Sequence, residues 1–314
     1  MKSVHWSGIE ERGSLLGLKF LLWCYRLVGR RLIWVCLFPV VCYFFISDKK
    51  GRAASKQFLT RATGKQASTW MSLKHYCSFA DAAFDKLDAW LDKIPLEDIE
   101  HTRPDAMQNI VNTGKGAILI GSHLGNLEVC RALGQGRYKT QINVLVFTDN
   151  AVKFNAILKQ VAPQVEVNLI SVGTIGPDTA ILLQEKVEQG EIVVIVGDRT
   201  SLSTSGRVVY QPFLGAEAPF SQGPFILAAL LKCPVYWLFC NKEQGKFKVA
   251  IEHVSDGIKL ARGQRQEILA GLIAQYAERL SYYAVKYPYQ WFNFYDFWQQ
   301  DDQVVRLKSE EECK

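Results

Sequence analysis

The chain has 314 residues, of which 48% are hydrophobic and 22% are charged, and this composition excludes a disordered protein. Its length suits one large α/β domain with an appendage, or two small domains. The net charge of +6 favours an anionic membrane surface or an acidic protein as a partner and disfavours nucleic acid. The eight cysteines include no Cys-x-x-Cys pair, so we expect free thiols in a reducing compartment and no metal site.

Residues 1–50 contain the strongest targeting pattern in the chain. Leu32 to Ile46 carries no charge, and as a helix it would be about 22 Å long, which is shorter than a hydrocarbon core of about 30 Å. Lys19, Arg26 and Arg30, just before it, fall on one face of a helix. We therefore expect a basic amphipathic helix and a short apolar helix that lie in, or dip into, an anionic leaflet. A buried core hairpin is the alternative.

Residues 51–112 are expected to be helical and connective. Apolar residues recur at helical spacing from Trp70 to Leu91, and Ile94-Pro95 ends the pattern because proline disfavours helix in the residue before it. His75 and His101 lie in this region. Both are expected to be surface or packing residues rather than ligands.

From residue 113 to residue 300 the pattern changes to apolar strands that alternate with amphipathic helices. The expected strands are Ala117–Ile120, Ile142–Phe147, Val165–Ile170, Ile192–Val196, Val235–Phe239 and Phe247–Ile251. The expected helices are Asn126–Leu133, Ala151–Val161, Pro177–Gln189 and Gln264–Val285. This order predicts a central mixed, mostly parallel sheet flanked by helices, with residues 113–300 as one α/β domain and residues 301–314 as a polar tail.

The segment from Gly121 to Glu128 follows the first expected strand and carries a histidine and a glutamate. At about 100° per residue, His123 and Glu128 would lie roughly 140° apart on a continuous helix. They can meet if His123 lies on a loop, Gly125 makes the turn and Asn126 caps a new helix. We then expect Glu128 to accept a hydrogen bond from one ring nitrogen, which leaves the other nitrogen as a general base.

Gly197-Asp198-Arg199 follows the expected strand Ile192–Val196 in the same way. Loops at the carboxyl ends of parallel strands gather at the ligand crevice of an open α/β sheet, so this loop and the His123 loop are expected to face one site. Arg199 would suit a phosphate or a developing oxyanion. A salt bridge between strand ends is the alternative.

Two apolar segments have more than one possible role. Phe213–Phe220 combines apolar residues with glycine and proline, and it could line a groove for an acyl chain or form an ordinary core turn. Trp291–Trp298 contains six aromatic residues in eight positions. This run could form a membrane-interface belt, the mouth of an acyl channel or a C-terminal plug of the core.

Together these segments resemble the lysophospholipid acyltransferase superfamily, in particular its bacterial branch similar to the late acyltransferases of lipid A biosynthesis. The matching residues are Ser122-His123-Leu124-Gly125-Asn126-Leu127-Glu128 for the His-x4-Glu block, Asp198-Arg199 for the second acidic and basic block, Phe213-Leu214-Gly215 with Ala218-Pro219 for the aromatic-glycine block, and Pro234-Val235 for the strand beyond it. The resemblance covers roughly residues 15 to 298.

The resemblance implies transfer of a fatty acyl group from a thioester, either acyl carrier protein or acyl-CoA, to a hydroxyl or amine of a lipid or glycolipid acceptor. His123 would be the general base and Glu128 its partner, and neither an acyl-enzyme nor a cofactor is implied. The residues that would contact the substrates are Ser122, Gly125, Asn126, Asp198, Arg199, Phe213 and Gly215. Such an enzyme is expected on the cytoplasmic face of a bacterial inner membrane.

Two other functions are compatible with the sequence. A membrane adaptor of the same fold would have lost catalysis, and a glycosyl- or nucleotidyl-transferring enzyme would use a similar open sheet. No complete phosphate-binding glycine loop is present in the sequence, which disfavours nucleotide binding. The final aromatic run lacks the basic residues usual in the family, so an aminolipid, a glycolipid or a pigment precursor is an acceptor alternative to lipid A.

Overall fold

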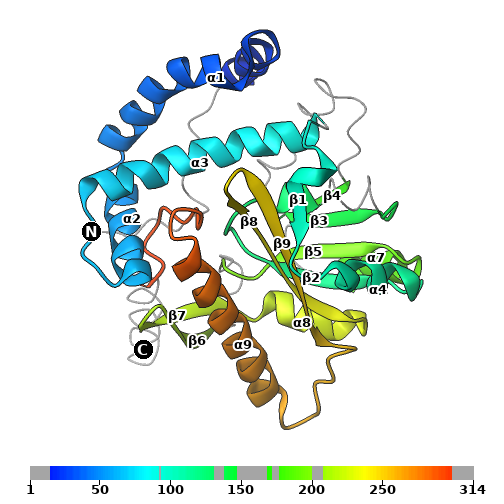
Figure 1. Ribbon diagram of the computed structural model, residues 1–314. Coiled ribbons are helices and arrows are strands. Elements are labelled where there is room, and N and C mark those ends of the chain that lie inside the picture. The colour runs from blue at the N-terminus through cyan, green and yellow to red at the C-terminus, as the bar shows by residue number, and fades with distance from the viewer. Residues whose placement is uncertain are drawn as a thin grey trace.

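The computed structural model describes residues 15–91, 93–130, 138–146, 168–171, 177–199 and 208–298. Seven of its described strands form one sheet in the order β1-β9-β8-β2-β5-β3-β4 (Figure 1). The strands are β1 (Ile99–His101), β2 (Ala117–Gly121), β3 (Ile142–Val146), β4 (Asn168–Ser171), β5 (Ile192–Val196), β8 (Val235–Glu243) and β9 (Lys246–Ser255). Neighbours are parallel except for the antiparallel pair β8 and β9, so the predicted mixed, mostly parallel α/β sheet is confirmed.

At one edge the sheet contains a strand that the sequence did not predict. β1 comes from the region expected to be connective, and it pairs with β9. At the other edge, β4 covers Asn168–Ser171 and overlaps the strand predicted from Val165 to Ile170. Residues 165–167 and the expected helix Ala151–Val161 lie outside the described residues. β1 has three residues, too few to show a clear hydrophobic period in the sequence.

Helices cover both faces of the sheet, and for this reason the sequences of β2 and β5 are continuous runs of apolar residues. The covering helices are α4 (Pro104–Asn112), α7 (Pro177–Glu188), α8 (Gly223–Leu231) and α9 (Arg265–Lys286). Ile118 and Ile120 of β2 pack on the face covered by α7, α8 and α9. Leu119 points to the opposite face, where α4 and the helical residues 127–130 pack. The predicted helices that correspond to α7 and α9 are confirmed.

Three further helices lie beside the sheet, drawn in blue and cyan in Figure 1. They are α1 (Leu15–Ser47), α2 (Lys49–Thr63) and α3 (Thr69–Trp90). α1 is broken at Gly29, whose φ of 72° and ψ of 175° belong to a region that is essentially restricted to glycine. Within the described ranges, no helix is by itself long and apolar enough to cross a membrane, but Leu32–Ser47 and Lys49–Thr63, bent by 91°, meet that test as a pair.

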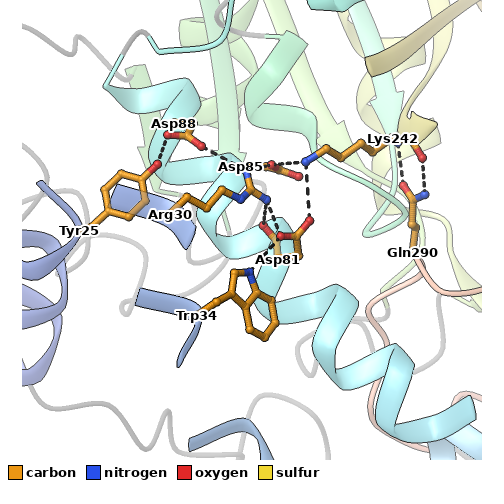
Figure 2. Close-up of polar contacts among 8 residues, drawn as sticks. All are labelled: Tyr25, Arg30, Trp34, Asp81, Asp85, Asp88, Lys242 and Gln290. Carbon is orange, nitrogen blue, oxygen red and sulfur yellow. Dashed lines mark hydrogen bonds and ion pairs between the residues drawn. The ribbon is translucent and has the colours of Figure 1, made fainter. Parts of the chain in front are cut away.

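An ionic network connects α1 to α3 and to the sheet (Figure 2). Arg30 of α1 donates to Asp81 at 2.5 Å and to Asp85 at 2.6 Å, and it also pairs with Asp88. The three aspartates share one face of α3, because they are four and three residues apart. Lys242 of β8 donates to Asp85 from the other side at 2.7 Å. The sequence placed Arg30 on a basic face toward an anionic leaflet, and this expectation is wrong: protein carboxylates surround its guanidinium group.

The segment that was predicted to be either an acyl groove or a core turn forms most of a β-hairpin. Its strands are β6 (Val208–Phe213) and β7 (Ala216–Ser221), which pair antiparallel. Leu214 and Gly215 connect them with φ values of 50° and 80°, as a two-residue turn of type I′ requires. Phe213 is fully buried, while Gly215 is exposed at the tip of the hairpin.

The aromatic run Trp291–Trp298 packs against this hairpin. The ring centroids of Trp291 and Phe297 lie 5.2 Å and 5.5 Å from that of Phe213. Both Trp291 and Phe297 are buried. Of the roles considered for this run, the structure supports a plug of the core.

Candidate active site

The carboxyl ends of β2 and β5 bring the two predicted loops together. The strands are parallel neighbours, and their register pairs Gly121 with Val196 at the last residue of each. The amide of Gly197 donates to the carbonyl of Gly121 at 2.9 Å and closes the pair. His123 and Asp198 each lie two residues beyond this point, so the register alone places them opposite each other.

His123 and Asp198 are joined by two hydrogen bonds. Nδ1 of His123 lies 2.8 Å from Oδ1 of Asp198, and the backbone amide of His123 donates to Oδ2 at 2.7 Å. A carboxylate can only accept hydrogen bonds, so Nδ1 carries the ring proton and Nε2 keeps a lone pair. Nε2 has no hydrogen-bond partner among the residues that the structure describes. This arrangement is that of a general base held by a carboxylate.

Glu128 does not lie where the sequence pattern predicts it. Asn126 caps the helix as expected, since its Oδ1 accepts the backbone amide of Glu128 at 3.1 Å, and residues 127–130 are helical. Nδ1 of His123, however, bonds to Asp198, and among the described residues no hydrogen bond joins the ring to Glu128, so the predicted pairing is wrong. The physical reason is the register of β2 and β5, which places Asp198 next to the ring before the helix begins.

The surroundings of the pair favour a neutral histidine and an ionised aspartate. The side chain of Asp198 is 1% exposed and that of His123 is 30% exposed. Burial lowers the pKa of His123, the positive charge of Arg199 lowers it further, and Asp198 opposes both effects. Burial alone would raise the pKa of Asp198, but its interaction with His123 and its hydrogen bonds hold that pKa below the ordinary value. The imidazole is therefore ready to accept a proton at neutral pH.

The turn that carries His123 is held tightly at Gly125. Its φ is +77°, and a Cβ atom at this position would lie 1.8 Å from the carbonyl oxygen of Cys240 in β8. The amide of Gly125 donates to the carbonyl of Gln290 at 2.7 Å, and the amide of Asn126 donates to the carbonyl of Cys240 at 2.8 Å. Both amides are thus committed to the fold. Neither amide is therefore available to stabilise an oxyanion.

The other residues that were predicted to contact the substrates lie at different distances from the imidazole ring of His123. Arg199 follows Asp198 directly, and its charge acts on His123. Ser122 is buried, and its Oγ accepts the amide of Leu124 at 3.3 Å, so it supports the turn. Phe213 and Gly215 lie in the hairpin core and at the hairpin tip, and no hydrogen bond or ring contact joins either to His123.

A cavity of about 210 Å³ lies beside the His123 loop, on the side of α3. Its walls include Asn126 from the loop and Asp81, Asp85 and Lys242 from the ionic network. The Nδ2 atom of Asn126 is buried and has no hydrogen-bond partner within the described ranges. The cavity is polar and large enough for several waters or a small polar group.

Trp291 is a site residue that the sequence analysis missed. Its indole Nε1 donates to Oδ2 of Asp198 at 2.9 Å. The residue belongs to an aromatic run, where a ring is expected to pack rather than to donate a hydrogen bond. The one signal in the sequence was the indole N–H itself, because a tryptophan that becomes buried normally finds a hydrogen-bond acceptor for this group.

No group of three or more histidine, cysteine, aspartate or glutamate side chains suited to a metal ion is found in the part of the chain that the structure describes. A comparison with the models of known protein families found no match to this chain. A comparison with curated proteins found no match either. The family resemblance therefore rests on the motifs in the sequence.

Proposed function

We propose that this protein is a membrane-associated acyltransferase. It moves a fatty acyl group from a thioester, acyl carrier protein or acyl-CoA, to a hydroxyl or amine of a lipid or glycolipid. The observation that carries the proposal is the pair in which Asp198 holds Nδ1 of His123 and leaves Nε2 unpartnered among the described residues. The order of motifs along the chain supports the choice of acyl transfer over other base-catalysed reactions.

In this reaction Nε2 of His123 takes the proton of the acceptor hydroxyl while the oxygen attacks the thioester carbonyl. The new C–O bond forms, and the carbonyl becomes a tetrahedral oxyanion. When the intermediate collapses, the C–S bond breaks, and the proton held on Nε2 goes to the departing thiolate. Asp198 stays ionised throughout and stabilises the transient imidazolium. No covalent acyl-enzyme is needed.

Arg199 is the side chain that we assign to the oxyanion. Its positive charge already acts on His123, so it lies close enough to influence charge that develops beside the ring. A preorganised cation of this kind typically contributes more to the rate than the base does. Asn126 offers a second donor through Nδ2, which is buried and unpartnered among the described residues.

The exposed face of α1 supports the membrane part of the proposal. Leu32, Val35, Tyr43 and Ile46 are between 62% and 71% exposed, and their spacing places them on one side of the helix. The opposite side of α1 packs on α3 through Val41 and other buried residues. A continuous apolar face of this kind is typical of a surface that meets lipid.

The direct test is acyl transfer from labelled acyl carrier protein, and separately from acyl-CoA, into a total bacterial lipid extract. H123Q serves as the control, since glutamine preserves hydrogen bonding but cannot act as a base. We expect a labelled lipid with the wild-type protein and none with H123Q, and the product mass would identify the acceptor. Equal labelling with H123Q would rule out the base, and no labelling with either donor would favour the adaptor function.

Membrane association is tested separately by flotation with vesicles that contain anionic lipids. The double variant V35E/I46E places charges on the exposed face of α1 and leaves its packing on α3 intact. We expect it to stay in the soluble fraction while the wild-type chain floats. Flotation of the variant at the wild-type level would exclude this face as the lipid contact.

A further inference from the structure

The carboxylate of Asp198 is held by a residue outside the loops that carry the candidate chemistry. Oδ2 accepts the amide of His123 at 2.7 Å and the indole Nε1 of Trp291 at 2.9 Å. Two donors on one oxygen fix the rotation of the carboxylate, and this rotation keeps Oδ1 aimed at Nδ1 of the imidazole. Without Trp291, the backbone amide of His123 would be the one donor left on Oδ2 among the described residues.

Trp291 is itself fixed from two sides. Its ring is fully buried, and the centroid of this ring lies 4.8 Å from that of the Phe58 ring in α2. Its backbone forms an antiparallel bridge with Leu124, next to His123 in the sequence. The amide of the following residue, Phe292, donates to the carbonyl of His123 at 3.0 Å. The segment around Trp291 thus runs alongside the His123 loop and bonds to it through the backbone.

A buried polar chain from α2 and α3 ends on Trp291. Nε2 of His75 lies 2.9 Å from the carbonyl oxygen of Trp291, and Nδ1 of His75 lies 3.0 Å from Oγ of Ser55. A carbonyl can only accept, so Nε2 carries the proton and Nδ1 accepts from Ser55. Oγ of Ser55 in turn accepts from Ser72 at 2.9 Å. Burial lowers the pKa of His75 to about 4, so the chain stays neutral and intact at neutral pH.

We propose that Trp291 and His75 are positioning residues for the His123–Asp198 pair. Trp291 sets the rotation of the Asp198 carboxylate, and His75 fixes the backbone from which Trp291 reaches it. Through these two residues the helices α2 and α3 determine which ring nitrogen of His123 carries the proton. The inference deepens the proposed function, since it assigns the support of the same base, but its test does not depend on turnover.

The test reads the tautomer of His123 by nitrogen-15 NMR of the full-length protein labelled at histidine. The wild-type ring should be protonated at Nδ1. In W291F we expect a mixture of tautomers, because the freed carboxylate no longer faces Nδ1. The matched control is W298F, which removes an indole N–H that bonds to the carbonyl of Phe213 at 3.2 Å in the same aromatic cluster. This control should keep the wild-type tautomer.

H75F adds a second variant that retains an aromatic ring. It removes both hydrogen bonds of His75, and we expect a smaller loss of the Nδ1 tautomer than in W291F. A pure Nδ1 tautomer in both W291F and H75F would overturn the proposal. If W291F does not fold, the indole N–H of Trp291 in the wild-type protein and in D198A, which lacks any side-chain acceptor at this position, decides: faster hydrogen exchange in D198A supports the bond, and unchanged exchange contradicts it.

The kinetic readout separates this inference from the proposed function. Once a substrate is found, W291F should lower kcat by about tenfold or more with little change in KM, since a hydrogen bond to a charged group has been lost. A rise in KM at constant kcat would assign Trp291 to substrate binding instead. If no acyl transfer is found but the tautomer changes as expected, the positioning role holds and only the reaction has been misassigned.

Discussion

The carboxylate of Asp198 binds both the ring and the backbone of His123, through Oδ1 at 2.8 Å and Oδ2 at 2.7 Å. One side chain therefore fixes the loop and the orientation of the imidazole that the loop carries. Because the contact is between the ends of two paired strands, its geometry is set by the sheet. A pair of this kind is preorganised before any substrate arrives.

The first prediction concerns which carboxylate serves His123. D198N should remove the acceptor for Nδ1 and reduce kcat on the order of 10²–10⁴-fold, the usual contribution of a general base. The matched variant E128Q should leave the tautomer of His123 unchanged, because Asp198 is the residue that holds Nδ1 of the ring. NMR of labelled histidine checks both variants. A changed tautomer in E128Q with an unchanged one in D198N would reverse the assignment.

The second prediction concerns pH. His123 must be neutral to act as a base, and its pKa lies below the ordinary value of 6.5, so activity should fall only as the pH drops below 6.5. Replacing Arg199 by glutamine removes a charge that lowers this pKa. The acid limb of the rate profile should therefore move to higher pH in R199Q, while R199K should keep it in place. A limb that does not move in R199Q would show that Arg199 does not act on the base.

The third prediction compares two glycines with similar backbone angles. Gly125 and Gly215 have φ values of 77° and 80°, but a Cβ at Gly215 meets nothing within 4 Å, whereas at Gly125 it meets the carbonyl of Cys240. G215A should cost about 1–2 kcal/mol of unfolding free energy from the strained φ alone. G125A should cost clearly more and should also reduce activity, since the His123 turn must move. Urea denaturation of both variants gives the comparison, and equal losses would contradict it.

The fourth prediction tests the ionic network. Lys242 bonds to Asp85, whose side chain is only 5% exposed, so K242M should lower the unfolding free energy by about 1–3 kcal/mol through loss of a charged hydrogen bond. Lys246, in the next strand of the same hairpin, pairs with the exposed Glu100. K246M should cause no measurable loss, because exposed ion pairs contribute little. Similar losses in the two variants would mean that burial of Asp85 does not matter.

Local patterns were enough to predict the central strands, the loop position of His123 and the cap at Asn126. Each of these depends on residues that are close together in the sequence. The partner of His123 could not be predicted in this way. Asp198 is 75 positions away, and it reaches the ring through the register between β2 and β5, whereas Glu128 is near only along the chain.

The hydrogen bond from Trp291 to Asp198 could not be predicted from local patterns either. It lies 93 positions from Asp198, and its bond depends on how the segment that follows α9 packs beside the His123 loop. Arg30 was misplaced for a similar reason, since its aspartate partners are more than fifty positions away on α3. Local sequence patterns predict the helices and strands, but they do not predict the side-chain contacts that join elements distant in the sequence.

The bond between Gly125 and Gln290 has a consequence for how the chain reaches its native state. A chain emerging from the ribosome presents α1, α2 and α3 first, then His123, and only much later residues 290–292. Until those residues arrive, the amide of Gly125 and the carboxylate of Asp198 each lack a native partner. During synthesis, α1 can therefore be available to a membrane before the base is held in place. The candidate site is expected to be among the last parts of the fold to form.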